Sequence, residues 1–127
     1  MSGLQEDTTP LQSELERLMA EFANEDRWEA IMLFSSDGLL MAGYGESPIL
    51  DSERLLEFAF SQMETVQMVG DDLPVKEIII RAQSGRLLAF RYFEALGEQL
   101  VLAAVANRRK GFRNAMNIII RHLKKTN

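Results

Sequence analysis

The sequence predicts an α+β domain, built as a three-layer α/β/α sandwich around a five-stranded antiparallel sheet. Segments with helical and strand periodicity follow one another in the order α-β-β-α-β-β-β-α. Neighbouring strand segments in the second half are joined by connections short enough for antiparallel hairpins. Two of these strands are apolar at nearly every position, so helices must cover both faces of the sheet.

The first helix and the first two strands are expected within residues 10–44. A proline at position 10 suits the first turn of a helix, and the helical pattern continues to about residue 24. Residues 28–35 and 39–44 are strand-like, and Asp37-Gly38 between them is a strong hairpin signal. We therefore interpret these two residues as turn chemistry and not as a metal site. The expected core stripe of the helix is Leu11, Leu15, Leu18 and Phe22.

The middle helix is expected to begin after a cap at Asp51 or Ser52 and to run to about Val69. Ser and Asp are favoured capping residues, and Gly70 supplies the usual C-terminal stop. Three strands at 75–82, 87–93 and 100–106 and a last helix at 112–125 complete the chain.

The strand compositions predict how the layers are arranged. Strand 75–82 mixes charged and apolar side chains on one face, which is typical of an edge strand. The first and last helices are expected on one face of the sheet and the middle helix on the other. In strand 87–93 the expected faces are Leu88, Phe90 and Tyr92 on one side and Leu87, Ala89 and Phe93 on the other.

Composition excludes several classes of chemistry. The 127 residues contain no cysteine and one histidine, so disulfides, thiol nucleophiles and most histidine-based metal sites are absent. We expect His122 to be structural, and we expect no cofactor and no enzymatic activity. No segment has the length of a membrane span or the pattern of a signal peptide, which predicts a cytoplasmic protein. Residues 1–8 are expected to form a flexible N-terminus and residues 9–127 a single domain.

The charge distribution is uneven, although the net charge is only −5. Residues 108–127 hold seven Lys or Arg and no acidic residue, while all nineteen acidic residues lie before them. Such a segment can bind nucleic acid or an anionic membrane. We favour a structural interpretation, in which basic side chains complement the end of the last helix and face an acidic first helix. No aromatic residue accompanies them, so we expect no nucleic-acid partner.

The middle helix has more apolar residues than one buried stripe requires. Phe60 and Met68 fall among Glu57, Ser61 and Glu64 on the side that should face solvent. Two large apolar side chains beside an already wide stripe predict a second buried surface, because such patches usually mark contacts between proteins.

The sequence resembles the roadblock family, which includes the roadblock-type dynein light chains and bacterial MglB. The resemblance covers about residues 10–125. It is carried by the element order, by the hairpin F-S-S-D-G-L-L (34–40), by the middle helix that ends at Gly70, by I-I-I-R-A-Q-S-G-R-L-L-A-F (78–90), and by V-L-A-A-V-A-N (101–107) before a basic helix.

The resemblance implies a homodimer, or a higher oligomer, formed through the middle helix and the third strand. It also implies a platform for a Ras-like small GTPase, acting as activator, scaffold or exchange-factor component, without nucleotide binding of its own. In this chain the corresponding segments are residues 53–69 and 75–82. The predicted dimer and partner interface consists of Leu56, Glu57, Phe60, Met63, Glu64, Gln67, Met68, Glu77, Ile79 and Arg81.

Two other functions stay open at this stage. One is a profilin-like sensor that holds a small molecule between sheet and helix, for which Tyr44 and Tyr92 are the few candidate polar anchors. The other is a general dimerisation or interaction domain without a GTPase partner.

Overall fold

The fold was analysed in a computed structural model. The predicted N-terminal segment, the helix stop at Gly70 and the basic residues 108–110 lie outside the residues that the structure describes. Those residues are 10–26, 28–48, 50–67, 75–106 and 112–125.

The first helix, α2 (Pro10–Asp26), is two residues longer than the sequence predicted. Its fully buried stripe is Leu15, Met19 and Ala23, which recur at four-residue spacing. Leu18 was predicted in this stripe, and that prediction was wrong. Its side chain is half-buried and lies beside α4.

The hairpin prediction is confirmed. Strands β1 (Trp28–Ser35) and β2 (Leu40–Gly45) pair antiparallel around the predicted turn. The turn is closed by the amide of Gly38, which donates to the carbonyl oxygen of Ser35 at 3.0 Å. Gly38 has a φ of +87°, a conformation that favours glycine.

Helix α3 (Ser52–Gln67) follows, and Asp51 is its cap: the amide of Arg54 donates to the Asp51 carboxylate at 2.9 Å. The predicted helix end near Val69 lies outside the described residues. The strands β3 (Glu77–Arg81), β4 (Leu87–Ala95) and β5 (Glu98–Ala106) come next. Helix α4 (Phe112–Lys125) completes the chain.

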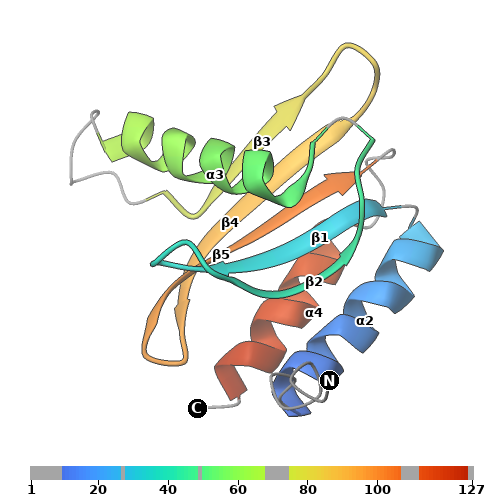
Figure 1. The fold of residues 1–127 in the computed structure, drawn as a ribbon, viewed down its shortest axis with the longest axis vertical. Coiled ribbons are helices and arrows are strands. Elements are labelled where there is room, and N and C mark those ends of the chain that lie inside the picture. The colour runs from blue at the N-terminus through green and yellow to red at the C-terminus, as the bar shows by residue number, and fades with distance from the viewer. Residues whose placement is uncertain (1–9, 27, 49, 68–74, 107–111, 126–127) are drawn as a thin grey trace, which may run out of the picture.

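The five strands form one antiparallel sheet in the order β2-β1-β5-β4-β3 (Figure 1). The three inner strands β1, β5 and β4 are mostly buried, and for β4 and β5 this agrees with their apolar sequences. The two edges are β2 and β3, so the edge position predicted for the third strand is confirmed.

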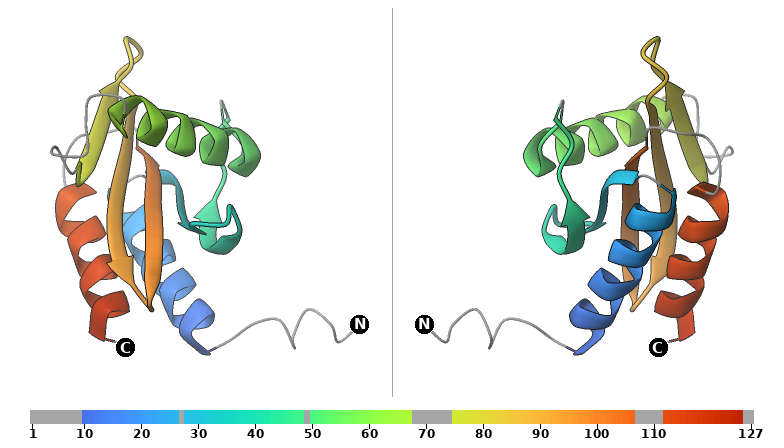
Figure 2. Two further views of the ribbon diagram at one scale, coloured as in Figure 1. Left: turned by 90° about the vertical axis from the view of Figure 1, so that its left-hand side faces the viewer. Right: turned by 90° about the vertical axis from the view of Figure 1, so that its right-hand side faces the viewer.

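The layers also match the prediction. Helices α2 and α4 cover one face of the sheet and α3 covers the other (Figure 2). Each face carries its own hydrophobic core, and β4 contributes to both by alternation. Its side chains Leu88, Phe90 and Tyr92 face α3, while Leu87, Ala89 and Phe93 face α2 and α4.

Charged side chains also join separate elements of the fold. Arg86, after the β3–β4 turn, donates through Nε to both carboxylate oxygens of Glu29 on β1, at 3.0 and 3.1 Å. On the other side of the sheet, buried Arg91 donates to Asn117 of α4 at 2.7 Å. None of the helices in the described ranges has the length and apolar character needed to cross a membrane.

Candidate functional site: the α3–β3 surface

The candidate site is the surface formed by α3 and the edge strand β3, which we call the α3–β3 surface. Among the α3 side chains that the structure describes, only Leu55 and Ala59 are fully buried against the sheet. Four larger apolar side chains pack on the same core but keep part of their surface exposed: Leu56, Phe58, Phe60 and Met63. The helix therefore presents apolar margins on both sides of its buried stripe.

Phe60 does not point into solvent, so that part of the sequence-based prediction was wrong. Its side chain is half-buried and packs on the core beneath α3. The β1–β2 turn explains this position, because a Cβ built at Gly38 would lie 3.7 Å from the Phe60 ring and 3.8 Å from Leu56. A turn earlier in the chain thus covers part of the predicted contact surface.

The exposed face of α3 is polar and mostly acidic. Glu57 and Glu64 both lie on it, as predicted. With Glu53 they make three exposed acidic side chains on this helix, against one exposed basic side chain, Arg54. Gln67 is the last residue of α3, but its side chain is not described, and Met68 lies outside the described residues. Among the described side chains of the helix, the exposed ones are Glu53, Arg54, Glu57, Ser61, Glu64 and Thr65.

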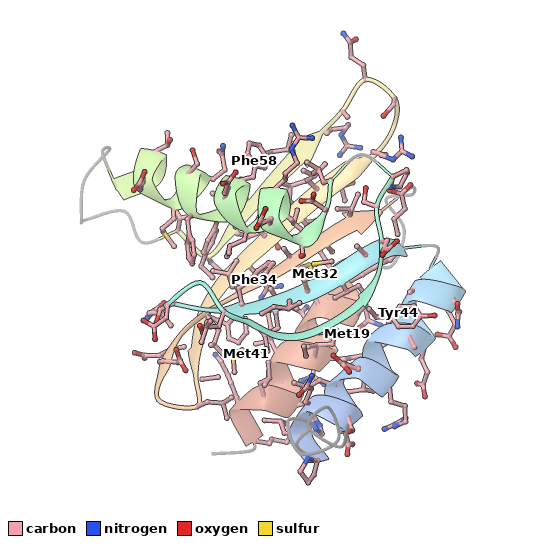
Figure 3. All side chains as sticks on the ribbon, viewed as in Figure 1. Met19, Met32, Phe34, Met41, Tyr44 and Phe58 are labelled. Carbon is pink, nitrogen blue, oxygen red and sulfur yellow. The ribbon has the colours of Figure 1, made fainter. Side chains whose placement is uncertain are left out.

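An open apolar groove of about 540 Å³ runs between α3 and the β3–β4 edge of the sheet. Phe58, which Figure 3 labels on α3, forms one wall. Its ring meets that of Phe90 edge-on at a centroid distance of 5.8 Å. In a helical projection of α3, Phe58 lies on the opposite margin from Phe60, and this is the signal in the sequence that indicates the groove. The lining residues are Leu50, Arg54, Glu57, Phe58, Ser61, Ile80 and Leu88.

Alternate residues of β3 direct their backbone amide and carbonyl groups away from β4, the strand that pairs with it. The amide of Tyr92 donates to Lys76 at 2.9 Å, and the amide of Ala82 donates to Arg86 at 2.8 Å. These bonds flank β3 and fix which residues point toward β4, because an antiparallel ladder alternates. The amides and carbonyls of Glu77, Ile79 and Arg81 therefore point away from the sheet.

The side chains of the same three residues have different surroundings. The Glu77 carboxylate lies 3.7 Å from buried Arg91 and 3.2 Å from Arg113 of α4. Ile79 is partly buried against the core under α2 and α4, and Arg81 is exposed. The structure thus brings all three to one edge of the sheet, with their side chains on the α2–α4 face and the apolar groove on the other face.

The two polar anchors expected for a small-molecule site do not converge on one cavity. The hydroxyl of Tyr92 is buried and donates to the carbonyl oxygen of Ala59 in α3 at 2.9 Å. Tyr44 lies on the other edge of the sheet and is exposed. In the described part of the chain, no cluster of three or more acidic, histidine or cysteine side chains is arranged to hold a metal ion.

The single histidine lies between the two helices of the opposite face. His122 of α4 is 3.8 Å from Glu14 of α2, which brings the basic last helix beside the acidic first helix, as predicted. This contact belongs to the α2–α4 packing and is separate from the α3–β3 surface.

Comparisons with known proteins place the fold. No protein-family model matches the sequence, and no curated protein matches it. Among solved structures, the chain is similar to Myxococcus xanthus MglB, with a TM-score of 0.69, 11% identity and coverage of 94% of this chain and 91% of that one.

Two further solved structures agree with this result. The gliding protein MglB from Thermus thermophilus gives a TM-score of 0.62 at 13% identity, covering 93% of this chain and 88% of that one. The Roadblock/LC7 domain from Streptomyces avermitilis gives 0.60 at 21% identity, covering 87% and 92%. The chain therefore has the fold that MglB shares with Roadblock/LC7 domain proteins.

Proposed function

We propose that the protein is a non-enzymatic, homodimeric regulator of a Ras-like small GTPase. The observation that carries the proposal is the edge strand β3, whose outward backbone groups lie next to an exposed acidic helix face and an apolar groove. An edge that is uncharged at its centre, flanked by apolar surface, is suited to pair with a second copy. The likeness to MglB and Roadblock/LC7 structures supports the same arrangement.

The register of the proposed dimer follows from which residues point outward. A two-fold axis at Ile79 pairs β3 antiparallel with its copy and joins the two sheets. Glu77 of one copy then lies opposite Arg81 of the other, and this opposite-charge pair occurs twice. Like charges would meet if the axis passed through Glu77 or Arg81. The charge pattern of β3 therefore favours the register centred on Ile79.

The groove beside β3 supports this dimer. Its apolar walls, with Phe58, Ile80 and Leu88 among them, lie next to the pairing edge. A second α3 helix brought in by strand pairing would cover this groove with its own apolar margin. Burying one such aromatic side chain contributes about 1.5–3 kcal/mol, so strand pairing alone does not have to hold the dimer. One MglB structure with similar fold is described as having a tetrameric arrangement.

We place the GTPase on the exposed faces of the two α3 helices. Glu57 and Glu64 give each helix a negative face, and dimerisation would double it. A partner that docks there needs a basic surface, because complementary charge accelerates association and excludes wrong partners. Arg54 lies in the first turn of α3, so we do not expect it to insert into the GTPase active site as an arginine finger. Any acceleration of GTP hydrolysis would therefore come from stabilising the active conformation of the GTPase.

The test uses the purified protein and Ras-like small GTPases from the same organism. Each GTPase is loaded with a non-hydrolysable GTP analogue or with GDP, and complex formation is measured by size-exclusion chromatography and calorimetry. We expect binding to the GTP form. The double variant Glu57→Lys plus Glu64→Lys should weaken it at least about tenfold. Phosphate release from GTP then distinguishes an activator from a scaffold.

The matched control changes two exposed glutamates on the opposite face of the molecule. Glu21→Lys plus Glu25→Lys alters the net charge equally but leaves α3 unchanged, so GTPase binding should stay within about twofold. Equal weakening by both double variants would show that the α3 face is not the docking surface. Absence of binding to every GTPase of the organism would leave a dimerisation domain without a GTPase partner.

A further inference from the structure

The second edge of the sheet carries an exposed apolar surface that the proposed function does not use. The large apolar side chains with the highest exposure in the described residues are Leu39, Leu40 and Tyr44, at 66%, 51% and 39%. All three belong to β2 or to the turn before it. The strand sequence Leu40–Gly45 contains no charged residue and no proline, the two features that commonly protect an edge.

A side chain of α2 occupies the centre of this edge. The amide of Gly43, at the centre of β2, donates to the carboxylate of Glu16 on α2 at 3.0 Å. Glu16 therefore occupies the position that a pairing strand would need. A partner on this side must bind through side chains.

A cleft of about 410 Å³ lies beside β2, between the strand, the loop that leads to α3, and α2. Gly43 forms part of its floor, because a Cβ built there would lie 3.4 Å from Met32 and 3.6 Å from Leu40. Met32 and Gly43 are cross-strand partners, so Tyr44, which Figure 3 labels on β2, points to the other face of the strand pair, toward α2. The cleft thus has an apolar floor, and Tyr44 borders it on the side of α2.

The charged groups around the cleft are all acidic. Glu16, Glu46 and Asp51 line it, and no lysine or arginine of the described residues does. Glu16 and Asp51 already accept hydrogen bonds from backbone amides, but each carboxylate retains further acceptor capacity. Glu46 is exposed at the rim. The cleft therefore suits a positively charged group with an apolar stem.

We propose that this β2 cleft binds a basic side chain from an extended segment of another protein, with apolar neighbours of that side chain on Leu40 and Tyr44. Arginine and lysine bury their aliphatic stems on apolar surface while the charged head meets carboxylates. Tyr44 adds a cation–π contact. The exposed leucines beside the cleft match a protein segment better than a free polyamine, which has no apolar side chains to cover them.

The experiment measures binding of a fluorescein-labelled peptide of alternating leucine and arginine to the full chain by fluorescence anisotropy. Two other peptides replace either the arginines by glutamate or the leucines by serine. We expect the leucine–arginine peptide to bind, the serine–arginine peptide to bind at least about fivefold more weakly, and the leucine–glutamate peptide not to bind. Leu40→Ser should weaken binding to a similar extent.

The matched control neutralises an exposed glutamate at the other end of the strands. Glu46 directly follows β2, at the end of the sheet where Gly45 pairs with Ala30. Glu94 lies at the opposite end, where it pairs with Gln99 near the β4–β5 turn. Glu46→Gln should weaken peptide binding about threefold or more, and Glu94→Gln by less than about 1.5-fold, in about 150 mM salt. Both variants change exposed side chains, and their unfolding midpoints should equal that of the wild type.

Four results would overturn the proposal. Failure of the leucine–arginine peptide to bind at millimolar concentration would remove the site. Equal effects of Glu46→Gln and Glu94→Gln would indicate non-specific attraction to an acidic protein. Spermine that displaces the peptide while the serine–arginine peptide binds equally well would indicate a polyamine site. A peptide that converts an oligomer to monomers would indicate that a second copy occupies the cleft.

Discussion

The hydroxyl of Tyr92 on β4 donates a 2.9 Å hydrogen bond to the carbonyl oxygen of Ala59, in the middle of α3. Both residues are buried, so the bond ties the helix to the sheet across the core on this face. Other contacts of α3 come from half-buried side chains on its margins. The position of the α3–β3 surface therefore depends on this hydrogen bond and on the burial of Leu55 and Ala59.

Replacing Tyr92 by phenylalanine should lower the free energy of unfolding by about 1 kcal/mol, the typical contribution of one such hydrogen bond. The Ala59 carbonyl still accepts its helical hydrogen bond, so no buried group is left unpaired. Urea denaturation measures the change. Tyr44→Phe is the matched control, because it removes an exposed hydroxyl, and it should change the unfolding free energy by less than about 0.5 kcal/mol. A loss equal to that of the control would show that the bond does not stabilise the helix.

The same residue predicts how stability responds to alkaline pH. Burial raises the pKa of the Tyr92 phenol from 10.0 to about 12. The folded pKa lies above the unfolded pKa, so the contribution of this group to stability is complete below pH 10 and is lost as the pH rises through 12. Between these values the unfolding free energy of the wild type should fall more steeply than that of Tyr92→Phe. Parallel pH profiles of the two proteins would contradict this prediction.

The sequence predicted the layers and the strand faces because short-range patterns determine them. Leu88 and Phe90 alternate with Leu87 and Ala89, and the structure places the two pairs in different cores. Likewise, the mixed composition of β3 indicated an edge, and β3 is an edge. Such features depend on residues within a few positions of each other.

The sequence could not predict contacts that join distant segments. A helical projection gave the direction of Phe60 around α3, but it could not show that the turn at Gly38 lies over that side of the helix. The outward direction of the Ile79 amide was also hidden, since it depends on the register between β3 and β4. The partner contacts of Glu57, Glu64 and the other interface residues stay predictions.

Gly45 should be the glycine least tolerant of substitution in the described residues. Its φ is +84°, and a Cβ there would overlap the carbonyl oxygen of Glu29. Gly45→Ala combines a strained backbone with a clash, so it should lower the free energy of unfolding by about 3 kcal/mol or more. Gly85→Ala is the control, because its φ of +96° is similar but a Cβ meets no atom within 4 Å. Gly85→Ala should lower the free energy of unfolding by only about 1 kcal/mol. Equal losses would mean that strain alone, without the clash, sets the cost.

The proposed register of the dimer predicts that two variants, each defective alone, will pair with one another. In a homodimer of Arg81→Glu, the introduced carboxylate faces the carboxylate of Glu77 on the other copy. In a homodimer of Glu77→Lys, the introduced ammonium faces the guanidinium of Arg81. Each like-charge contact occurs twice, so the dissociation constant of each homodimer should be at least about tenfold higher than that of the wild-type dimer. In a mixed dimer both contacts become attractive again.

Equimolar mixing of the two variants should therefore restore a dimer in sedimentation equilibrium, as a heterodimer that a tag on one chain can identify. Glu77→Lys also removes the carboxylate beside Arg91 and Arg113, but that internal loss is common to its homodimer and to the heterodimer. Comparing the two isolates the contact across the edge. Lys124→Glu, on the exposed face of α4, should leave the wild-type dimer unchanged. Homodimers of normal affinity, or a mixture that stays monomeric, would rule out pairing centred on Ile79.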